Sequence, residues 1–448
     1  MNRKILFIAS CVALAATSMS FAIRGDIMGD FENQFVVPYV GVQDEELEVL
    51  DEEGVAAVED PVKSYLGIIS GAAFFTFGLA ILFGGPLCDL LGMGRLLRLA
   101  AVCHIGGTAL TIFAPNFWVV VAATFIIGAA NGLVEAVCNP LIATIYPDQK
   151  AKRLMIFHAW FPGGIVIGGL FAFLFTKIGQ SLPEEGYEWL LPLLGWQGKM
   201  ALLLIPSVIY TVMIFAQEFP PTERVASGVS TGDMFKEAAM RPLFLLILVM
   251  MLFTAATELG VGQWIANIYN DVMSQLGTGD ATAGVLLLVW GSGLMFVLRQ
   301  FGSNVVHKLS PVGVIAGTAP FAAVGLWICS TAASPILWFV GSGLMYFGFC
   351  FWWPAMLGIT AERFPKTGAL GLAVVGAAGA FSTWIAGPVM GYLNDNYGPT
   401  QLLRIWIVLP ALILVVFGIL YFSDMSRGGY KKLIERLDSG IAPENNEG

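Results

Sequence analysis

The chain has 448 residues, of which 57% are hydrophobic and only 12% are charged. Its mean hydropathy is +0.76. Soluble domains carry about 25% charged residues, so this composition excludes a soluble enzyme, a nucleic-acid-binding protein and a disordered scaffold. The formal charge of −9 comes mostly from acidic loops at 44–60 and 183–188 and from the C-terminal tail, and it indicates no particular partner. We therefore expect an integral membrane protein that acts within the lipid bilayer.

Twelve apolar segments are each long enough to cross a bilayer core of about 30 Å. The predicted fold is all-α, with twelve transmembrane helices in two six-helix repeats. The spans are expected at 5–35 (interrupted), 65–88, 96–114, 117–146, 154–177, 198–217, 243–270, 282–301, 312–332, 335–361, 369–393 and 402–423. We expect an N-terminal bundle at 1–217, a cytoplasmic linker at 218–242, a C-terminal bundle at 243–424 and a cytoplasmic tail at 425–448.

The first span has an alternative interpretation as a cleavable signal peptide. Arg3 and Lys4 precede an apolar run that ends at Ser20-Phe21-Ala22, which is the order of features in such a peptide. Removing the run would leave eleven spans and break the division into two sets of six. We therefore expect the first span to be retained.

The basic residues predict the orientation, because cytoplasmic flanks of membrane proteins are rich in Lys and Arg. With the N-terminus inside, most of the 23 lysines and arginines, Arg299 among them, fall on the cytoplasmic side. The two acidic loops then fall outside. We expect a multi-pass protein of the cell (inner or plasma) membrane with both termini in the cytoplasm.

Internal similarity indicates tandem halves. The loop that begins at Gly85, between spans two and three, is matched by a loop that begins at Gly302, between spans eight and nine. Asn139-Pro140 in span four is similarly matched by Trp353-Pro354 in span ten. Both offsets are close to half the chain length, and repeats of this kind are typical of transporters.

The first of these loops resembles the signature of the major facilitator superfamily. The matching residues are Gly85, Asp89, Gly92, Arg95 and Arg98. A carboxylate at the end of a helix can pair with nearby arginines and latch two helices together, and glycine permits the tight turn between them. We expect these residues to form a cytoplasmic gating latch.

Two further stretches resemble the fucose permease family of sugar:proton symporters. Span four contains Glu135 followed by Asn139-Pro140, and span seven contains Glu258, Trp264 and Asn267 at the spacing of that family. The resemblance implies sugar transport driven by protons and a first-span acid that takes up the coupling proton. Arg24 departs from the family pattern, which has neutral polar residues before that acid.

Ionisable residues inside spans are costly and are functional candidates by default. In span one, Asp26 and Asp30 share a helix face and are candidates for proton coupling. Alternatively, Asp30 belongs to the outer loop and caps the helix. Arg24 cannot lose its charge, so we expect it to pair with Asp26, Asp30 or Glu135. An unpaired Arg24 facing the cavity would instead favour a carboxylate or phosphate on the substrate, and the sequence leaves both alternatives open.

Span four carries a polar stripe of Asn131, Glu135 and Asn139 at four-residue spacing. Burial disfavours the charged form of a carboxyl group, so Glu135 could be neutral in one access state and ionised in another. That behaviour is what proton coupling requires. The alternative is an interhelical hydrogen bond with a purely structural role, above all for Asn131.

Span seven offers side chains suited to a hydroxyl-rich solute. Gln263 and Asn267 supply paired donors and acceptors, and Trp264 supplies a flat apolar face, unless it belongs to the outer aromatic belt. His158 and Trp160 in span five are weaker candidates.

The sequence shows no nucleotide-binding loop, metal-ligand cluster or hydrolase triad. We expect neither enzyme activity, cofactor nor metal.

The predicted function is proton-coupled uptake of a sugar or related small polar solute by a monomer, whose partners are the solute, protons and the bilayer. The alternatives are transport of a uronate or other organic acid through Arg24, a proton-independent facilitator, and a membrane sensor. The predicted proton-coupling residues are Asp26, Asp30 and Glu135, and the predicted substrate-binding residues are Arg24, Asn131, Asn139, His158, Trp160, Glu258, Gln263, Trp264 and Asn267.

Overall fold

The computed structural model describes residues 1–41, 52–183, 189–228, 230, 232, 236, 240–277 and 283–438. Residues 44–51 and 184–188 of the two acidic loops predicted on the outer side lie outside the described residues, as do parts of the linker and the end of the tail. The prediction of a loop is wrong for residues 52–60, which form the first turns of a helix. All regular secondary structure in the described part of the chain is helical.

The first half of the chain supplies six predicted spans. They correspond to α1 (Arg3–Asp26), α5 (Glu52–Leu91), α6 (Met93–Ile112), α7 (Phe117–Ile145), the pair α8 (Lys150–His158) and α9 (Trp160–Ser181), and the pair α11 (Trp196–Ala201) and α12 (Leu204–Phe215). Short segments complete this half: α2 (Met28–Phe31), η1 (Glu32–Val36), α3 (Val37–Val40), η2 (Pro147–Gln149), α10 (Leu191–Leu194) and, after the sixth span, α13 (Glu223–Ser227).

The second half supplies the other six. They are formed by α15 (Pro242–Ala255) with η3 (Ala256–Gly260) and α16 (Val261–Gln275), by α17 (Ala283–Thr331), by α18 (Pro335–Phe349) with α19 (Trp352–Arg363), by α20 (Gly368–Tyr397), and by α21 (Pro399–Trp406) with α22 (Val408–Ser426). The short η4 (Pro365–Thr367) precedes α20, and α23 (Tyr430–Asp438) follows the last span.

The span count agrees with the sequence. Within the described residues, eleven helices are long and apolar enough to cross a membrane, and Leu286–Gly302 is a shorter apolar helix. The eighth and ninth spans run together as α17, where Ser310 has a left-handed φ of 66° immediately before Pro311. The twelve-helix fold is therefore as predicted, whereas the division into two bundles at 218–242 stays a prediction.

Prolines determine where two of the spans are interrupted. A proline has no N–H, so the carbonyl four residues before it loses its helical donor. Pro162 lies four residues after His158, where α8 ends, and Pro354 lies four residues after Cys350, between α18 and α19. The seventh span is interrupted by the π-helical turn η3, which contains Glu258. Such turns are often found at functional sites.

Small residues allow the helices to approach closely. A Cβ at Gly164 of α9 would lie 2.4 Å from the carbonyl oxygen of Ala15, and one at Gly85 of α5 would lie 2.3 Å from the Cβ of Ala373 in α20. The first contact makes α1 an integral part of the bundle. The second contact joins helices from the two halves of the chain.

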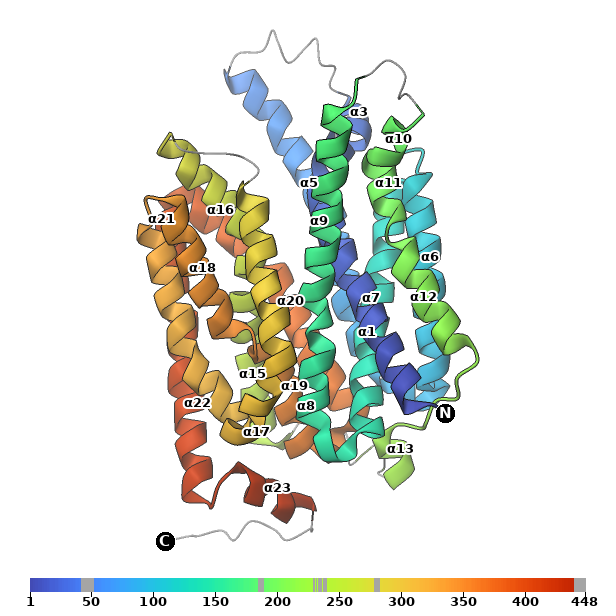
Figure 1. Ribbon diagram of the computed structural model, residues 1–448, viewed down its shortest axis with the longest axis vertical. Helices are drawn as coiled ribbons and strands as arrows, with labels where there is room; N and C mark the ends of the chain where they lie inside the picture. Colours follow the sequence, from blue (N-terminus) through green and yellow to red (C-terminus); the bar gives the residue numbers. More distant parts are fainter. Residues whose placement is uncertain are drawn as a thin grey trace.

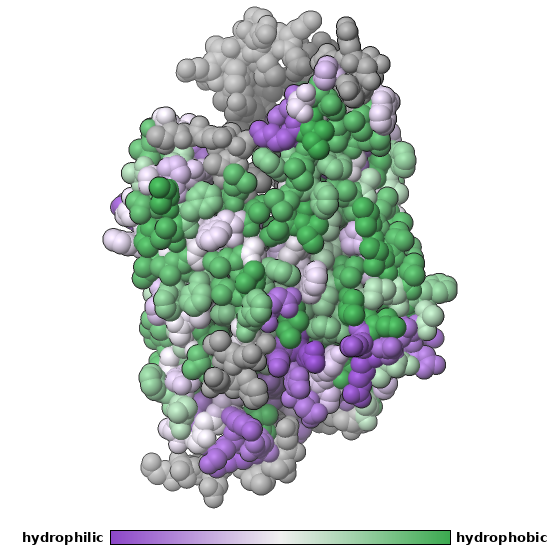
Figure 2. Space-filling view, viewed as in Figure 1, coloured by the Kyte–Doolittle hydropathy of each residue, from purple (hydrophilic) through white to green (hydrophobic). Residues whose placement is uncertain are grey.

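The ends of the bundle differ in character. Figure 1 shows the start of α1, the linker helix α13 and the C-terminal helix α23 at the same end of the molecule. Figure 2 shows a broad apolar surface between the two ends, with hydrophilic side chains gathered toward the end that carries α23. This distribution is that of a multi-pass membrane protein.

Candidate functional site

A series of polar contacts lies deep in the first half of the chain, between α7 and α8. The amide Nδ2 of Asn139 donates to Oε2 of Glu135 at 2.8 Å, and Oδ1 of Asn139 lies 2.9 Å from Nε2 of His158. All three side chains are buried. The i, i+4 spacing of Glu135 and Asn139 predicted that they share a helix face, and the structure adds His158 as their partner from the next span.

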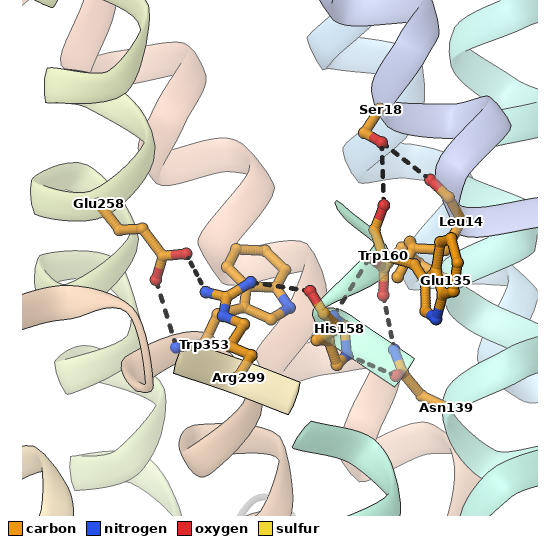
Figure 3. Close-up of polar contacts among 9 residues, drawn as sticks. All are labelled: Leu14, Ser18, Glu135, Asn139, His158, Trp160, Glu258, Arg299 and Trp353. Carbon is orange, nitrogen blue, oxygen red and sulfur yellow. Dashed lines mark hydrogen bonds and ion pairs between the residues drawn. The ribbon is translucent and has the colours of Figure 1, made fainter. Parts of the chain in front are cut away.

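Arg299 of α17 continues these contacts into the second half. Its Nη2 donates to Oε1 of Glu258 at 2.5 Å, and its Nη1 donates to the main-chain carbonyl of His158 at 2.9 Å. Its Nε donates to the carbonyl of Cys350. Figure 3 shows Arg299 between Glu258 on one side and His158 on the other. Neither carbonyl has a helical N–H donor, because Pro162 and Pro354 lie four residues further on. The guanidinium therefore replaces two missing main-chain hydrogen bonds.

Arg299 is a residue of the site that the sequence did not reveal. It was predicted only as one of the positive charges on the cytoplasmic side, but its side chain is 1% exposed and paired with Glu258. The side of the membrane on which it lies stays a prediction. The signal that could have identified Arg299 was Glu258 itself, because a carboxylate that stays ionised inside an apolar span is stabilised by a cation.

The two buried glutamates have different surroundings. Glu258 has its ion pair with Arg299 and also accepts the main-chain N–H of Trp353 at 3.4 Å. Glu135 has no lysine or arginine within ion-pair distance among the described residues, and its nearest basic atom is Nδ1 of His158 at 4.0 Å. Glu135 is therefore the acid that can exist as a neutral group without leaving a cation unpaired.

Helix α16 presents polar side chains to open space. Gln263 and Asn267 are exposed one turn apart on the helix. Trp264 is partly buried beside Gly391 of α20, where an added Cβ would lie 3.4 Å from its ring. Two donors of the second half, Tyr346 Oη and Trp353 Nε1, are buried with no hydrogen-bond partner among the described residues. These groups could all bind a hydroxyl-rich molecule.

Near the C-terminal end of α1 the predicted ion pairs of Arg24 are wrong. Asp26 pairs with Lys199 of α11 at 2.5 Å, and Lys199 also donates to Thr176 of α9 at 2.7 Å. Arg24 is 6% exposed, yet its Nη2 has no hydrogen-bond partner, and no ion pair joins it to an acid in the described part of the chain. The sequence could not reveal the pairing of Asp26, because Lys199 lies five spans away.

Asp30 lies beyond the end of α1, in α2. Its side chain is exposed. Partial burial nevertheless raises its pKa above 3.8, an effect that Lys199 opposes and Asp26 reinforces. This position agrees with the alternative that Asp30 belongs to the helix end rather than to the span interior.

Two of the predicted substrate ligands are engaged within the protein. Asn131 uses both ends of its amide: Oδ1 lies 2.7 Å from Nε2 of His104, and Nδ2 donates to Oγ of Ser20 at 2.9 Å. Trp160 packs edge-on against Phe296 of α17, with ring centroids 5.5 Å apart. The first contact holds the first half together, and the second joins the two halves.

The predicted cytoplasmic latch has a different partner from the one expected. Asp89 forms its ion pair with Arg224 of α13 at 2.7 Å and accepts the Thr222 hydroxyl, whereas the signature suggested Arg95 or Arg98. Arg95 donates to the carbonyl of Leu91 and Arg98 to those of Phe215 and Gln217. Gly92 has a φ of 86°, as the tight turn requires. The latch therefore fastens the linker helix to the first half.

Interrupted membrane helices, with buried charges where the two halves of the chain meet, are typical of secondary transporters. The family model described as Major Facilitator Superfamily matches residues 5–318. The chain belongs to this superfamily, whose members are membrane transporters rather than enzymes.

Known relatives agree with this assignment. The major myo-inositol transporter IolT of Bacillus subtilis is 27% identical over 124 residues, which is 28% of this chain and 26% of that protein. The chain thus matches about a quarter of the length of such curated relatives. The proton:xylose symporter XylE has the same fold, with a TM-score of 0.73 at 14% identity, covering 92% of this chain and 94% of that one. The E. coli fucose:proton symporter FucP gives 0.71 at 15% identity, covering 94% and 99%. The resemblance inferred from the sequence is confirmed.

Proposed function

We propose that this protein takes up a small hydroxyl-rich solute, a sugar or a related compound, by alternating access coupled to protons. The names of the relatives support this class of solute, since they transport myo-inositol, xylose and fucose. The exposed amides of α16 and the unpartnered donors Tyr346 and Trp353 support it on chemical grounds, because hydroxyl groups require both donors and acceptors.

The observation that carries the proposal is the connection between Glu135 and Arg299. An ionised Glu135 holds the Asn139 amide, which positions His158, and the carbonyl of His158 receives Arg299 from the other half. A neutral Glu135 is a weaker acceptor, because only the ionised form makes a charge-assisted bond. Binding a proton at Glu135 therefore loosens a contact between the two halves, which is how a proton can bias the access state.

We place the coupling proton on Glu135 rather than on Asp26. A proton on Asp26 would leave the buried ammonium group of Lys199 without its acidic partner, whereas no lysine or arginine among the described residues pairs with Glu135. Asp30 is the alternative proton carrier. Glu258 remains ionised with Arg299 in this proposal and acts in positioning.

We further infer that the end bearing α13 and α23 faces the cytoplasm of the cell membrane, and that the monomer is the transporting unit. The positive side chains near that end, such as Lys150 and Arg224, support this orientation. Both termini would then be cytoplasmic.

Uptake by proteoliposomes tests the proposal. The purified protein is reconstituted and offered neutral solutes (xylose, fucose and myo-inositol) and sugar acids (glucuronate and galacturonate) with the interior alkaline, and again with no pH gradient. We expect at least one of these solutes to accumulate above the external concentration only with the gradient, and the medium to become more alkaline when that solute is added. Equal uptake under both conditions would identify a facilitator and contradict coupling. Binding in a thermal-shift assay without flux would contradict transport.

A further inference from the structure

Among the buried lysine and arginine side chains of the described spans, Arg24 alone lacks an acidic partner. The other buried lysine and arginine side chains each have an acidic partner: Lys199 with Asp26, Arg299 with Glu258, and Arg363 with Asp424. Arg24 is buried to the same degree but has no acid beside it in the described structure, and its Nη2 lacks any hydrogen-bond partner. A buried cation of this kind is costly, so Arg24 is a site where an anion from outside the protein would be stabilised.

The position of Arg24 suits contact with a solute. Its guanidinium lies over the ring of Phe21, one turn below it on α1, with 5.9 Å to the ring centroid. Phe21 belongs to a phenylalanine cluster that includes Phe74 of α5 and Phe161 of α9. It also packs against the group of Phe77, Ile81, Ala373, Ala377 and Ala380, which joins α5 to α20. Arg24 thus lies just above the contact between the two halves.

Open space flanks Arg24 on the same helix. A Cβ added at Gly25 or at Gly29 would meet no heavy atom within 4 Å, and both glycines are exposed. Phe21 and Gly25 are four residues apart and share one face of α1 above the phenylalanine cluster, and Gly29 follows in α2, beyond the end of α1. A small solute can therefore approach the main chain next to Arg24.

We propose that Arg24 binds a carboxylate of the transported solute, so that the solute is a hydroxylated monoanion such as a sugar acid. The inference rests on the transport function proposed above and specifies its substrate class. A single unpaired guanidinium matches one negative charge and can bind a carboxylate through two parallel hydrogen bonds. A phosphate would bring close to two charges, and only one cation is available to balance them.

The charges on Glu135 and Arg24 predict which gradient drives uptake. One proton on Glu135 and one monoanion on Arg24 together carry no net charge. Uptake of one solute with one proton is then electroneutral, driven by the pH difference and insensitive to the membrane potential.

Matched pairs of sugars test the carboxylate assignment. Binding to the full-length protein is measured for glucose against glucuronate, galactose against galacturonate, and glucose 6-phosphate. We expect each acid to bind at least about tenfold more tightly than its neutral partner, which is 1.4 kcal/mol or more. Arg24→Gln and Arg24→Met should remove this preference, whereas Arg427→Gln, which removes an exposed positive charge, should retain it.

The melting temperatures of the unliganded variants test whether Arg24 lacks a partner within the protein. Replacing an uncompensated buried charge by a residue of similar volume removes a cost, so the melting temperature of Arg24→Met without ligand should equal or exceed that of the wild type. A lower melting temperature in both Arg24 variants would overturn the inference, because it would show that Arg24 has a partner within the protein.

The outcomes separate this inference from the proposed function. If neutral sugars are accumulated with protons as well as their acids, and Arg24→Met is unaffected, the carboxylate assignment fails while transport stands. Tighter binding of glucose 6-phosphate than of glucuronate would also overturn the carboxylate assignment.

If no solute of either set is taken up under any gradient, the transport function itself fails. Uptake of the acid that changes when valinomycin and potassium impose a membrane potential would contradict electroneutral coupling.

Discussion

Nη1 of Arg299 lies 2.9 Å from the main-chain oxygen of His158, and the two residues belong to opposite halves of the chain. The contact exists because Pro162 removes the helical donor that His158 would otherwise have. The same guanidinium replaces the donor that Pro354 removes from Cys350. A single side chain thus completes the main-chain bonding of two interrupted spans and joins the halves at the centre of the molecule.

Removing Arg299 should therefore destabilise the protein strongly. We expect Arg299→Met to lower the free energy of unfolding by about 3–5 kcal/mol, because Glu258 would be left buried and unpaired. The double variant Arg299→Met with Glu258→Gln should recover part of this loss. Chemical unfolding in detergent, followed by tryptophan fluorescence, measures both values.

Arg299→Lys separates the ion pair from the carbonyl contacts. A lysine can pair with Glu258, but one nitrogen lacks the fork geometry that reaches two carbonyls as well. We expect a stability between those of the wild type and Arg299→Met. A wild-type value for Arg299→Met would show that the contact does not hold the halves together.

The exposed amide of Asn267 provides a test of solute binding. Asn267→Ala should weaken binding about tenfold, since a hydrogen bond to a polar ligand contributes about 1 kcal/mol or more. Its melting temperature should stay unchanged, because the side chain is exposed. Ser274→Ala, on the same face of α16 but farther out, serves as the control in isothermal titration. Equal affinity in the two variants would remove Asn267 from the site.

Much of this architecture could be predicted from the sequence. The apolar runs gave the twelve spans, and the four-residue spacing placed Glu135 beside Asn139. The pairing of charges could not be predicted, because it depends on which helices lie side by side. Arg299 was predicted only as a positive charge on the cytoplasmic side and Lys199 was not among the predicted site residues, yet each is buried against an acid from a distant span.

The sequence predicted the position of Pro354 in a repeat but not what the prolines do in the site. Pro354 was noted as part of a repeat, but the free carbonyl four residues before it matters only because Arg299 can reach it. Asn131 was predicted to contact substrate, whereas His104 and Ser20 occupy its amide. The contact of Arg299 and the hydrogen bonds of Asn131 both depend on which helices are neighbours in three dimensions, and residue spacing within one helix does not reveal this.

The ion pair between Asp89 and Arg224 should control access from the end bearing α13. Cys88 is 2% exposed beside Asp89, and its thiol donates to the carbonyl of Ala136 at 3.5 Å. We expect Asp89→Asn to raise the alkylation rate of Cys88 at least about tenfold, since breaking a buried pair costs more than 1.4 kcal/mol. Mass spectrometry would measure the rate, with the partly exposed Cys103 as the internal standard. An unchanged ratio of the two rates would contradict the latch.

The pair of Asp26 and Lys199 should act in stability rather than in coupling. Asp26→Asn leaves a buried ammonium group with Thr176 as its remaining partner, so we expect a lower melting temperature. Adding Lys199→Met should restore it. Solute accumulation driven by the pH gradient should persist in the double variant, and its loss would return Asp26 to the coupling machinery.

Replacing Glu135 tests whether this residue carries the coupling proton. Glu135→Gln keeps the size of the side chain and mimics the protonated state. We expect this variant still to exchange labelled for unlabelled solute across the membrane but to lose accumulation driven by the pH gradient at least tenfold, or about 1.4 kcal/mol. Asp30→Asn, the alternative carrier, should behave as the wild type. Full gradient-driven accumulation by Glu135→Gln, or its loss in Asp30→Asn alone, would contradict proton coupling through Glu135.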